Sequence, residues 1–483
     1  MTTGREAFRC PVIIPAVTIL FVAVAAFGGG NDPESVKLKG QEGRSHTSAL
    51  VEKRRTISEK IVGQLDSSAI RESLASSPDL RRIAYVSRVG AKQFVVVDGK
   101  EGKHYDGIGK GILTQGQQAA YFGAPIFSPD SSRVAYAARE GGKWFVVVDG
   151  KEEKSYDDIN ALTLIFSPDS HRVAYVVGVG AKQSVVVGGK EEKPYDWIGD
   201  LLFSPDSRRV AYWAGVGGKR LVVVDDKEGK PYDGVAQGEG PYFLPDSSWV
   251  ALTYRSVLFS PDSRRLAYSA TLGPNGFAVV DGKEQKPYGN IYDGPIFSPD
   301  SRRVMYMAYS PGGGPNYKVV VVDGKEEKHY DGIGEGSLQF SPNSRRVAYC
   351  AKAGARWFAV VDGKEEKAYD DMISDLIFSP DSRRVAYAAG KGGKWFAVVD
   401  GKEEKAYDDM GSSPIFSPDS RRVAYWAKVG EKYLLVVDGE QGKPYDDLVR
   451  YTIVFDSAST FHYLAVKQTA RGQDVYLVEE TIE

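Results

Sequence analysis

Cysteine is scarce in this chain of 483 residues, and neither sign of charge is in excess. With only Cys10 and Cys350, the protein cannot contain a framework of several disulfides. Its 62 lysines and arginines nearly balance its 64 aspartates and glutamates, which gives a formal net charge of −2. Proteins that bind nucleic acid usually have a basic excess or a basic stripe, so we expect no nucleic-acid partner.

Sequence patterns that are typical of catalytic and metal sites are also missing. The chain has no HExxH, no CxxC, no GxSxG nucleophile elbow and no calcium loop of the D-x-[DN]-x-[DN]-G type. Its histidines are dispersed, and His104 and His329 occupy a position where equivalent segments have proline, alanine or serine. We therefore predict a protein that is not an enzyme and that has no metal and no cofactor.

One continuous apolar run exists near the N-terminus, from Pro11 to Phe27. It follows Arg5 and Arg9 and contains the small-x-small sequence Ala23–Ala25, which is typical of a signal-peptidase site. The run is short for a membrane span. Residues 1–27 are thus expected to be a signal peptide or, alternatively, a retained N-terminal anchor. Either case predicts an extracytoplasmic protein, periplasmic or secreted.

What the chain has in abundance is repetition, with a unit of roughly 38 residues. Residues 414–447 read PIFSPDSRRVAYWAKVGEKYLLVVDGEQGKPYDD, and similar stretches recur along the chain. The aspartate of the Ser-Pro-Asp element, or its equivalent, falls at Asp79, Asp130, Asp169, Asp206, Asp246, Asp262, Asp300, Asn343, Asp381, Asp419 and Asp456.

Each unit is predicted to contain four short strands, called A to D here. In residues 414–447, strand A is Pro414–Ser417, strand B is Arg422–Tyr425, strand C is Tyr433–Asp438 and strand D is Lys443–Asp446. Ser-Pro-Asp-Ser supplies a turn between A and B, and Asp-Gly supplies a two-residue hairpin turn between C and D. Small sheets repeated in this way bury both of their faces only by stacking on one another, which predicts an all-β fold, a β-propeller of about ten to eleven four-stranded blades.

The element FSPDSRRVAY resembles the FSPDG-type signature of TolB-like propeller repeats, which are similar to WD40 repeats. The resemblance extends over most of the chain. It implies a β-propeller, and TolB-like proteins act through protein partners in the cell envelope. One departure is consistent, because serine replaces the usual glycine after the aspartate, as at Ser131, Ser301 and Ser420.

The sequence determines the fold better than it determines the number of rings. Asp246 and Asp262 are only 16 residues apart, so the unit at Leu244–Tyr254 is too short to contain strands C and D. We therefore expect two propellers, residues 76–255 and residues 256–483, preceded by a linker with one short helix in residues 28–75. The alternative is a single large ring.

Strand alternation predicts that the A–B and C–D turns lie on one face of the disc and the B–C and D–A loops on the other. The first face then has nearly invariant sequences, and the second has the insertions Gly107–Ala124 and Ser310–Asn316. Length variation on a rigid scaffold is typical of binding surfaces, although drift after duplication also accumulates in loops. The candidate binding residues on this second face are Gln117, Gln118, Tyr121, Phe122, Asp158, Trp197, Asp371 and Asp409.

Three sets of repeated residues allow both a functional and a structural interpretation. The aspartates of the Tyr-Asp-Asp elements could bind a cation, but they more often cap turns and pair with lysine or arginine. The arginine pairs could form a basic ring, or they could hold neighbouring blades together. The Lys-Trp-Phe tryptophans, Trp144, Trp357 and Trp395, could form a ligand platform, or they could pack between blades. The structural interpretation is preferred for all three sets.

We expect a monomeric, non-catalytic, extracytoplasmic propeller. It is expected to bind protein partners, such as cell-envelope proteins, through its second face. Nearly equal blades suit this role better than a single asymmetric active site. The alternative is a propeller that binds carbohydrate or a small ligand, with weak hydrolase or lyase activity. This step depends on analogy between folds, since fold alone does not determine function.

Overall fold

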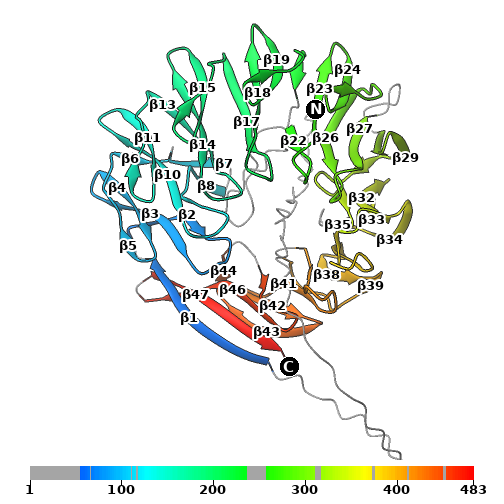
Figure 1. The fold of residues 1–483 in the computed structure, drawn as a ribbon. Coiled ribbons are helices and arrows are strands. Elements are labelled where there is room, and N and C mark those ends of the chain that lie inside the picture. Colours follow the sequence, from blue (N-terminus) through cyan, green and yellow to red (C-terminus); the bar gives the residue numbers. More distant parts are fainter. Residues whose placement is uncertain are drawn as a thin grey trace, which may run out of the picture.

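All regular structure in the described part of the chain is β-strand, and all strand pairs are antiparallel. The computed structural model describes residues 55–65, 67–109, 111–115, 118–235, 257–309, 317–372, 376–410, 413–449, 453–470 and 472–482. Within these ranges no helix is long and apolar enough to cross a membrane. Ten sheets of four or five strands follow one another around one ring, so the predicted β-propeller is confirmed (Figure 1).

Each of the ten sheets is one blade, and the blades are numbered here along the chain. Blade 1 contains β2 (Ala69–Ser76), β3 (Ile83–Val89), β4 (Lys92–Val97) and β5 (Lys100–Glu101). Blade 2 contains β6 (Gly107–Ile108), β9 (Ile126–Phe127), β10 (Val134–Glu140), β11 (Lys143–Val148) and β12 (Lys151–Glu152). Blade 3 contains β13 (Asp158–Phe166), β14 (Val173–Val179), β15 (Lys182–Val187) and β16 (Lys190–Glu191).

The next three blades repeat this order. Blade 4 contains β17 (Trp197–Phe203), β18 (Val210–Val216), β19 (Lys219–Val224) and β20 (Lys227–Glu228). Blade 5 contains β21 (Gly234–Val235), β22 (Val257–Phe259), β23 (Leu266–Leu272), β24 (Asn275–Val280) and β25 (Lys283–Glu284). Blade 6 contains β26 (Asn290–Phe297), β27 (Val304–Tyr309), β28 (Lys318–Val322) and β29 (Lys325–Tyr330).

The last four blades complete the ring. Blade 7 contains β30 (Gly332–Ile333), β31 (Gln339–Phe340), β32 (Val347–Ala353), β33 (Arg356–Val361) and β34 (Lys364–Tyr369), and blade 8 contains β35 (Asp371–Met372), β36 (Ile377–Phe378), β37 (Val385–Lys391), β38 (Lys394–Val399) and β39 (Lys402–Glu403). Blade 9 contains β40 (Ile415–Phe416), β41 (Val423–Val429), β42 (Lys432–Val437) and β43 (Glu440–Tyr445). Blade 10 contains β44 (Asp447–Leu448), β45 (Val454–Phe455), β46 (Thr460–Thr469), β47 (Gly472–Ile482) and, from the other end of the chain, β1 (Arg55–Leu65).

The hydrophobic core is divided into layers between neighbouring blades. In β10, Ala135 and Ala137 pack into the layer shared with blade 3, whereas Val134, Tyr136 and Ala138 pack into the layer shared with blade 1. Successive side chains of a strand point to opposite faces, so a continuous apolar sequence such as Val-Ala-Tyr-Ala-Ala fits a strand that is covered on both sides. Each blade therefore depends on both of its neighbours.

The ring closes through pairing between the two ends of the chain. Strand β1 pairs with β47 from Arg55–Ile482 to Leu65–Gln473 and forms the outermost strand of blade 10 (Figure 1). Arg55 forms an ion pair with Glu480, which is buried and also accepts a hydrogen bond from Tyr463. The prediction of a linker with one helix is therefore wrong for the described residues between 55 and 75, which form β1 and most of β2.

The preferred division into two rings is not confirmed, since the ten sheets form a single ring. Strands β21 and β22 both pair with β23, so residues 236–256 connect two strands of the same blade. The predicted short unit at Leu244–Tyr254 and the predicted boundary at residue 255 lie outside the described residues. One ring also agrees with the inter-blade contacts, which continue from blade 4 to blade 5 and from blade 5 to blade 6.

Serine side chains of the A–B turns link the blades on the first face. The backbone N–H of Asp262 donates to Oγ of Ser301 in the next blade, at 2.9 Å, and equivalent bonds join blades 1 to 9 in sequence. Ser301 has a φ of 64°, in the left-handed region that favours glycine. Serine at this position thus provides a hydrogen-bond acceptor for the neighbouring blade, which a glycine would lack.

The second arginine of each pair strengthens the same contact. Arg303 bonds to Asp323 of its own C–D turn, with Nε 2.8 Å from Oδ2, and donates from Nη1 to the carbonyl of Ser344 in blade 7 at 3.0 Å. Its guanidinium also lies over the ring of Phe340, also in blade 7, 5.2 Å from the ring centre. The expected role in holding blades together is confirmed for this arginine, although its carboxylate partner is in the C–D turn.

The uniform Asp-Gly-Lys-Glu segment has a similar role at the outer edge of the ring. Glu326 in blade 6 accepts bonds from Lys286 and from the hydroxyl of Tyr288 in blade 5, at 2.7 and 3.0 Å. Glu59 of β1 takes this role at the ring closure, where it bonds to Lys443, Tyr445 and Lys467. Strand β1 thus supplies the outer strand of blade 10, and its Glu59 makes the contacts that the glutamate of the Asp-Gly-Lys-Glu segment makes in other blades.

We predict that Ser301→Ala destabilises the ring more than Ser301→Gly does. Both variants leave the Asp262 N–H without its acceptor, which costs about 1–3 kcal/mol. The glycine variant also releases the left-handed strain, which is worth roughly 1–2 kcal/mol. Denaturant midpoints should therefore fall in the order wild type, Ser301→Gly, Ser301→Ala. A glycine variant that is less stable than the alanine variant would contradict this account.

We also predict a pH-dependent contribution from Glu59 to ring closure. Burial alone would raise the pKa of Glu59, but the bonds from Lys467, Tyr445 and Lys443 outweigh it and lower the pKa from 4.5 to about 2. A carboxyl with a lowered pKa stabilises the fold above its unfolded pKa and loses this effect as the pH falls through the folded value. The stability difference between wild type and Glu59→Gln should be about 2 kcal/mol at pH 7 and be largely lost near pH 2. If the stability difference between wild type and Glu59→Gln is the same at pH 6 and at pH 2.5, Glu59 does not make this contribution.

Candidate functional site: the face of the B–C and D–A loops

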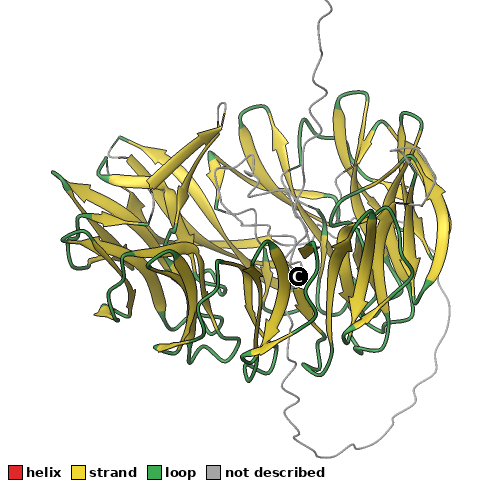
Figure 2. Cartoon of the chain, turned by 90° about the horizontal axis from the view of Figure 1, so that it is seen from above, coloured by secondary structure: helices red, strands yellow, loops and turns green. Residues whose placement is uncertain are grey.

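The two faces of the ring differ in the chemistry of their turns. Viewed at right angles to Figure 1, the connecting loops gather at the two edges of the ring (Figure 2). The predicted pairing of turns is confirmed by contacts, because the A–B turn arginine Arg82 bonds to Asp98 of the C–D turn. The D–A loop Asp106 bonds instead to Lys92, the first residue of strand C in its own blade, and to Gly141 in the B–C turn of blade 2.

In several blades the first aspartate of the Tyr-Asp-Asp or Tyr-Asp-Gly element bonds both to the start of strand C in its own blade and to the B–C turn of the next blade. Asp106 Oδ1 is 2.8 Å from Lys92 Nζ in its own blade, and its Oδ2 accepts the Gly141 N–H of the next blade at 2.8 Å. The bond from Lys92 and then that from Gly141 lower the pKa of Asp106. These carboxylates are therefore committed to the scaffold. In the described ranges no three His, Cys, Asp or Glu side chains group closely enough to bind a metal ion.

Exposed apolar side chains concentrate on the second face. Five B–C turns each present one, immediately before the glycine of the turn, and these side chains are 39–57% exposed: Val89, Val179, Val216, Leu272 and Val429. Among the other large apolar side chains that are exposed in the described ranges, Trp197 and Tyr317 lie beside the same loops, Leu162 lies on the innermost strand of blade 3, and Ile61 lies on β1. Blades 3 to 5 are consecutive and present Leu162, Val179, Trp197, Val216 and Leu272, which together are called the apolar arc here.

Trp197 is part of a compact aromatic cluster in blade 4. The Arg220 guanidinium lies 4.7 Å from the ring centre of Trp197 and 4.9 Å from that of Trp213. The two indoles meet edge to face, with ring centres 5.6 Å apart. Each tryptophan faces a glycine on the paired strand, Gly215 opposite Trp197 and Gly199 opposite Trp213, so the rings lie directly on the backbone. This arrangement fixes a 41%-exposed indole on the second face.

The remaining predicted site residues do not form one site. Asp158 and Asp371 begin β13 of blade 3 and β35 of blade 8, and Asp409 forms an isolated bridge with Lys428 ahead of β40 in blade 9. Gln118, Tyr121 and Phe122 belong to β8 (Gln118–Phe122), which forms a hairpin with β7 (Gly111–Gln115) and lies beside β2. Gln117 lies outside the described residues. The described candidates thus lie at separate places in the ring and do not come together in one site.

Three tryptophans and one cysteine agree with the structural interpretation of the sequence. Trp144, Trp357 and Trp395 are half-buried and pack against the layers between blades. Cys350 is a free thiol that is buried in β32. Cys10 lies outside the described residues.

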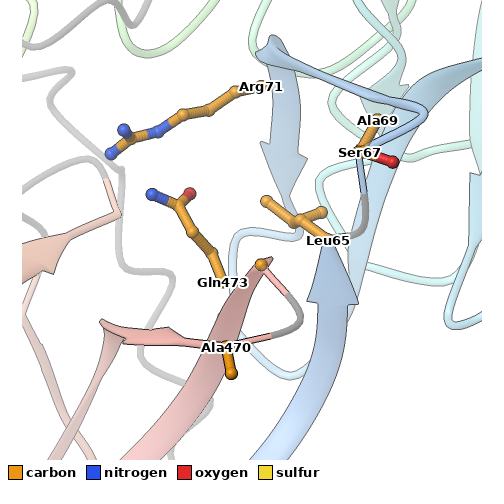
Figure 3. Close-up of a pocket in the computed structure, with 7 residues that line it drawn as sticks. Leu65, Ser67, Ala69, Arg71, Ala470 and Gln473 are labelled. Atoms are coloured by element: carbon orange, nitrogen blue, oxygen red, sulfur yellow. The ribbon is translucent and has the colours of Figure 1, made fainter.

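A cavity of about 430 Å³ lies where the ring closes (Figure 3). It is bounded by the ends of β1 and β2 and by the turn between β46 and β47, and Arg71 and Gln473 extend across it (Figure 3). Arg71 is already paired with Asp447. The cavity therefore lies at the junction of the two chain ends. Arg71 is the charged residue of its described lining, and Asp447 neutralises that charge.

Two buried polar residues could not be predicted from the repeat pattern. His462 is 2% exposed and bridges Asp456, at 2.8 Å, and the carbonyl of Asp79 in blade 1, at 2.7 Å. It completes the first-face contacts between blades 10 and 1. Asp293 accepts the N–H of Gly336 in blade 7, and its burial raises its pKa to about 6. His462 and Asp293 both differ from the residue type found at the same strand position in other blades. This difference is the feature of the sequence that could have indicated their roles.

We predict that Gly215→Ala displaces the Trp197 indole. A Cβ at Gly215 would lie 1.6 Å from Trp197 Nε1, so the ring must move, at a cost of about 1–3 kcal/mol. The near-ultraviolet circular dichroism of the variant should approach that of Trp197→Phe. Gly107→Ala in blade 2 is the matched control, because its Cβ would have no neighbour closer than 4.0 Å. An unchanged aromatic spectrum for Gly215→Ala would contradict the described packing.

No protein-family model matches this chain, and no curated protein matches its sequence. Solved structures do match it. A crystal structure of the eukaryotic initiation factor aligns over 80% of this chain and 90% of its own length, at 11% identity and a TM-score of 0.42.

Two further matches are described as a TolB and as a β-propeller domain. A protein assigned as TolB from Agrobacterium tumefaciens aligns over 44% of this chain and 83% of its own, at 16% identity and a TM-score of 0.22. The Cps50 (Swd1) β-propeller domain of Myceliophteria thermophila aligns over 61% and 98%, at 11% identity and a TM-score of 0.26. These likenesses concern the fold, and the propeller assignment itself depends on the ten sheets described above.

Proposed function

We propose that this protein is a non-catalytic, extracytoplasmic propeller that binds a protein partner through its second face. The contact surface is the apolar arc on blades 3 to 5, formed by Leu162, Val179, Trp197, Val216 and Leu272. Exposed apolar side chains that group on one part of a surface are typical of protein–protein contact sites, and tryptophan is enriched among the residues that dominate binding energy.

The difference between the two faces is the observation that carries this proposal. On the first face the turn serines, arginines and aspartates bond to the next blade, as Ser301 and Arg303 do. On the second face the aspartate–lysine pairs hold the turns, and the residues at their tips are free to vary. Five of those tips present valine or leucine to solvent, which stabilises nothing in the isolated ring. Covering them with a partner would remove apolar area from water.

The extracytoplasmic location is proposed from the sequence of residues 1–27, with its arginines, apolar run and small-x-small site. A non-catalytic role is supported by the way in which two of the described histidines are used. His462 is bonded on both ring nitrogens, and His104 stacks on Phe94 with ring centres 4.4 Å apart. Both act in packing and blade contacts.

We predict that a bait of residues 28–483 captures a specific protein from an envelope extract, and that Val179→Ser/Val216→Ser/Leu272→Ser loses it. Since the three side chains are exposed, the fold should tolerate the change, while affinity should fall at least tenfold, or about 1.4 kcal/mol. The measurement is quantitative enrichment followed by titration of the captured protein.

The matched control alters the first face instead, as Arg264→Ser/Arg302→Ser/Arg383→Ser, whose side chains are exposed there. This variant should retain the partner. Equal capture by the second-face variant, or loss by the first-face control alone, would refute the proposed contact surface. Thermal unfolding of all baits confirms that differences in capture do not reflect unfolding.

A further inference from the structure

Blade 5 differs from the other blades at its boundary with blade 6, where a cleft of about 340 Å³ opens on the second face. We propose that this cleft binds a neutral, hydroxyl-rich ligand, a single saccharide unit. Its polar lining comes from Ser269, Thr271, Asn275 and Asn290, and glycine backbone completes it. The cleft adjoins the end of the apolar arc at Leu272, whose chain neighbours Thr271 and Gly273 line it, and it adds a small-ligand function to the proposed scaffold.

The ion pair that most other blades have at this place is missing from blade 5. In blades 1 to 4 and 7 to 9, a lysine or arginine at the start of strand C pairs with the aspartate that follows strand D, as Lys394 does with Asp408. Blade 5 has Asn275 and Gly289 at these two positions. Both partners are thus replaced in the same blade, and both replacements line the cleft.

A third change in blade 5 shapes one wall. Most described strands C have a long side chain at their second residue, such as Trp144, Arg220 or Trp395, but β24 has Gly276. A Cβ at Gly276 would lie 2.7 Å from the Asn290 Cα and 3.0 Å from the Ile291 nitrogen. Glycine is therefore required for β26 to approach β24, and this approach brings Asn290 to the cleft.

The floor of the cleft contains a hydroxyl that is available to a ligand. Ser269 is 5% exposed and lines the cleft, and its Oγ has no hydrogen-bond partner among the described side chains and backbone groups. At the equivalent position, most other blades have an apolar residue, such as Ala137, Val176 or Met307, or a tryptophan. The Ser269 hydroxyl can therefore donate a hydrogen bond to a ligand in the cleft or accept one from it. Thr271 lies two residues further along β23, on the same side of the strand.

The lining selects the class of ligand. No charged residue of the described chain lines the cleft, so ionic ligands gain nothing there to offset the loss of their hydration. Serine and threonine hydroxyls and asparagine amides both donate and accept hydrogen bonds, which matches the mixed donors and acceptors of sugar hydroxyls. The volume is near the lower end of the range of about 300–1,000 Å³ for small-molecule sites, which suits one saccharide unit.

The test is saturation-transfer NMR and calorimetric titration of the full chain with a panel of neutral sugars: glucose, galactose, mannose, N-acetylglucosamine and their disaccharides. At least one should bind, and glucuronate and glucosamine should bind at least tenfold more weakly than the best neutral sugar. Asn275→Lys/Gly289→Asp restores the ion pair of the other blades and should abolish binding. The added side chain has room, since a Cβ at Gly289 would have its nearest neighbour 3.8 Å away. Ser269→Ala should weaken binding five- to tenfold.

The control is Glu431→Lys, which adds a positive charge to the exposed B–C turn of blade 9 and should leave sugar binding unchanged. The proposal is overturned if no neutral sugar binds at millimolar concentration, or if Asn275→Lys/Gly289→Asp binds as wild type does. Protein capture through the apolar arc is measured separately. Loss of sugar binding with capture retained, or the reverse, therefore distinguishes the two proposals.

Discussion

Each blade has two apolar faces, and only its two neighbours can cover them. Tyr136 and Ala137 are adjacent in β10, yet they pack into different layers of the core. A linear stack of such blades would leave an uncovered apolar face at each end, so the array must close on itself. Closure depends on β1, whose Arg55 reaches Glu480 across 425 residues of sequence. The ring is therefore the smallest unit in which every blade is fully covered.

The same constraint explains why the repeats are so uniform. Serine at the left-handed position, arginine in the A–B turn and glutamate after Asp-Gly-Lys all make contacts to the neighbouring blade, as Ser301, Arg303 and Glu326 do. Each of these residues must match a partner in the adjacent unit, so a change in one unit affects two. Many of the charged side chains form local ion pairs, some within a blade, as Arg303 and Asp323 do, and others between blades, as Lys286 and Glu326 do.

Departures from uniformity then become informative. The Trp197–Arg220 cluster in blade 4 and the cleft beside Asn275 in blade 5 both lie on the second face, where no contact of the first-face type is disturbed. At the ring closure, by contrast, the departures replace a lost contact, as Glu59 and His462 do. Variation that restores a blade contact is structural, whereas variation that exposes apolar or unpaired polar groups points to binding.

The sequence alone determined the features that depend on neighbours within one unit. Strand alternation, the Ser-Pro-Asp and Asp-Gly turns and the two faces were predictable, because hydrophobic period and turn chemistry act over a few residues. Strand β1 was predicted to be part of a linker because it has no repeat pattern, and its partner β47 lies at the other end of the chain. The single ring, the partner of each charge and the cleft at Ser269 were decided by the tertiary structure, since they arise from contacts between units whose distance and orientation no local pattern encodes.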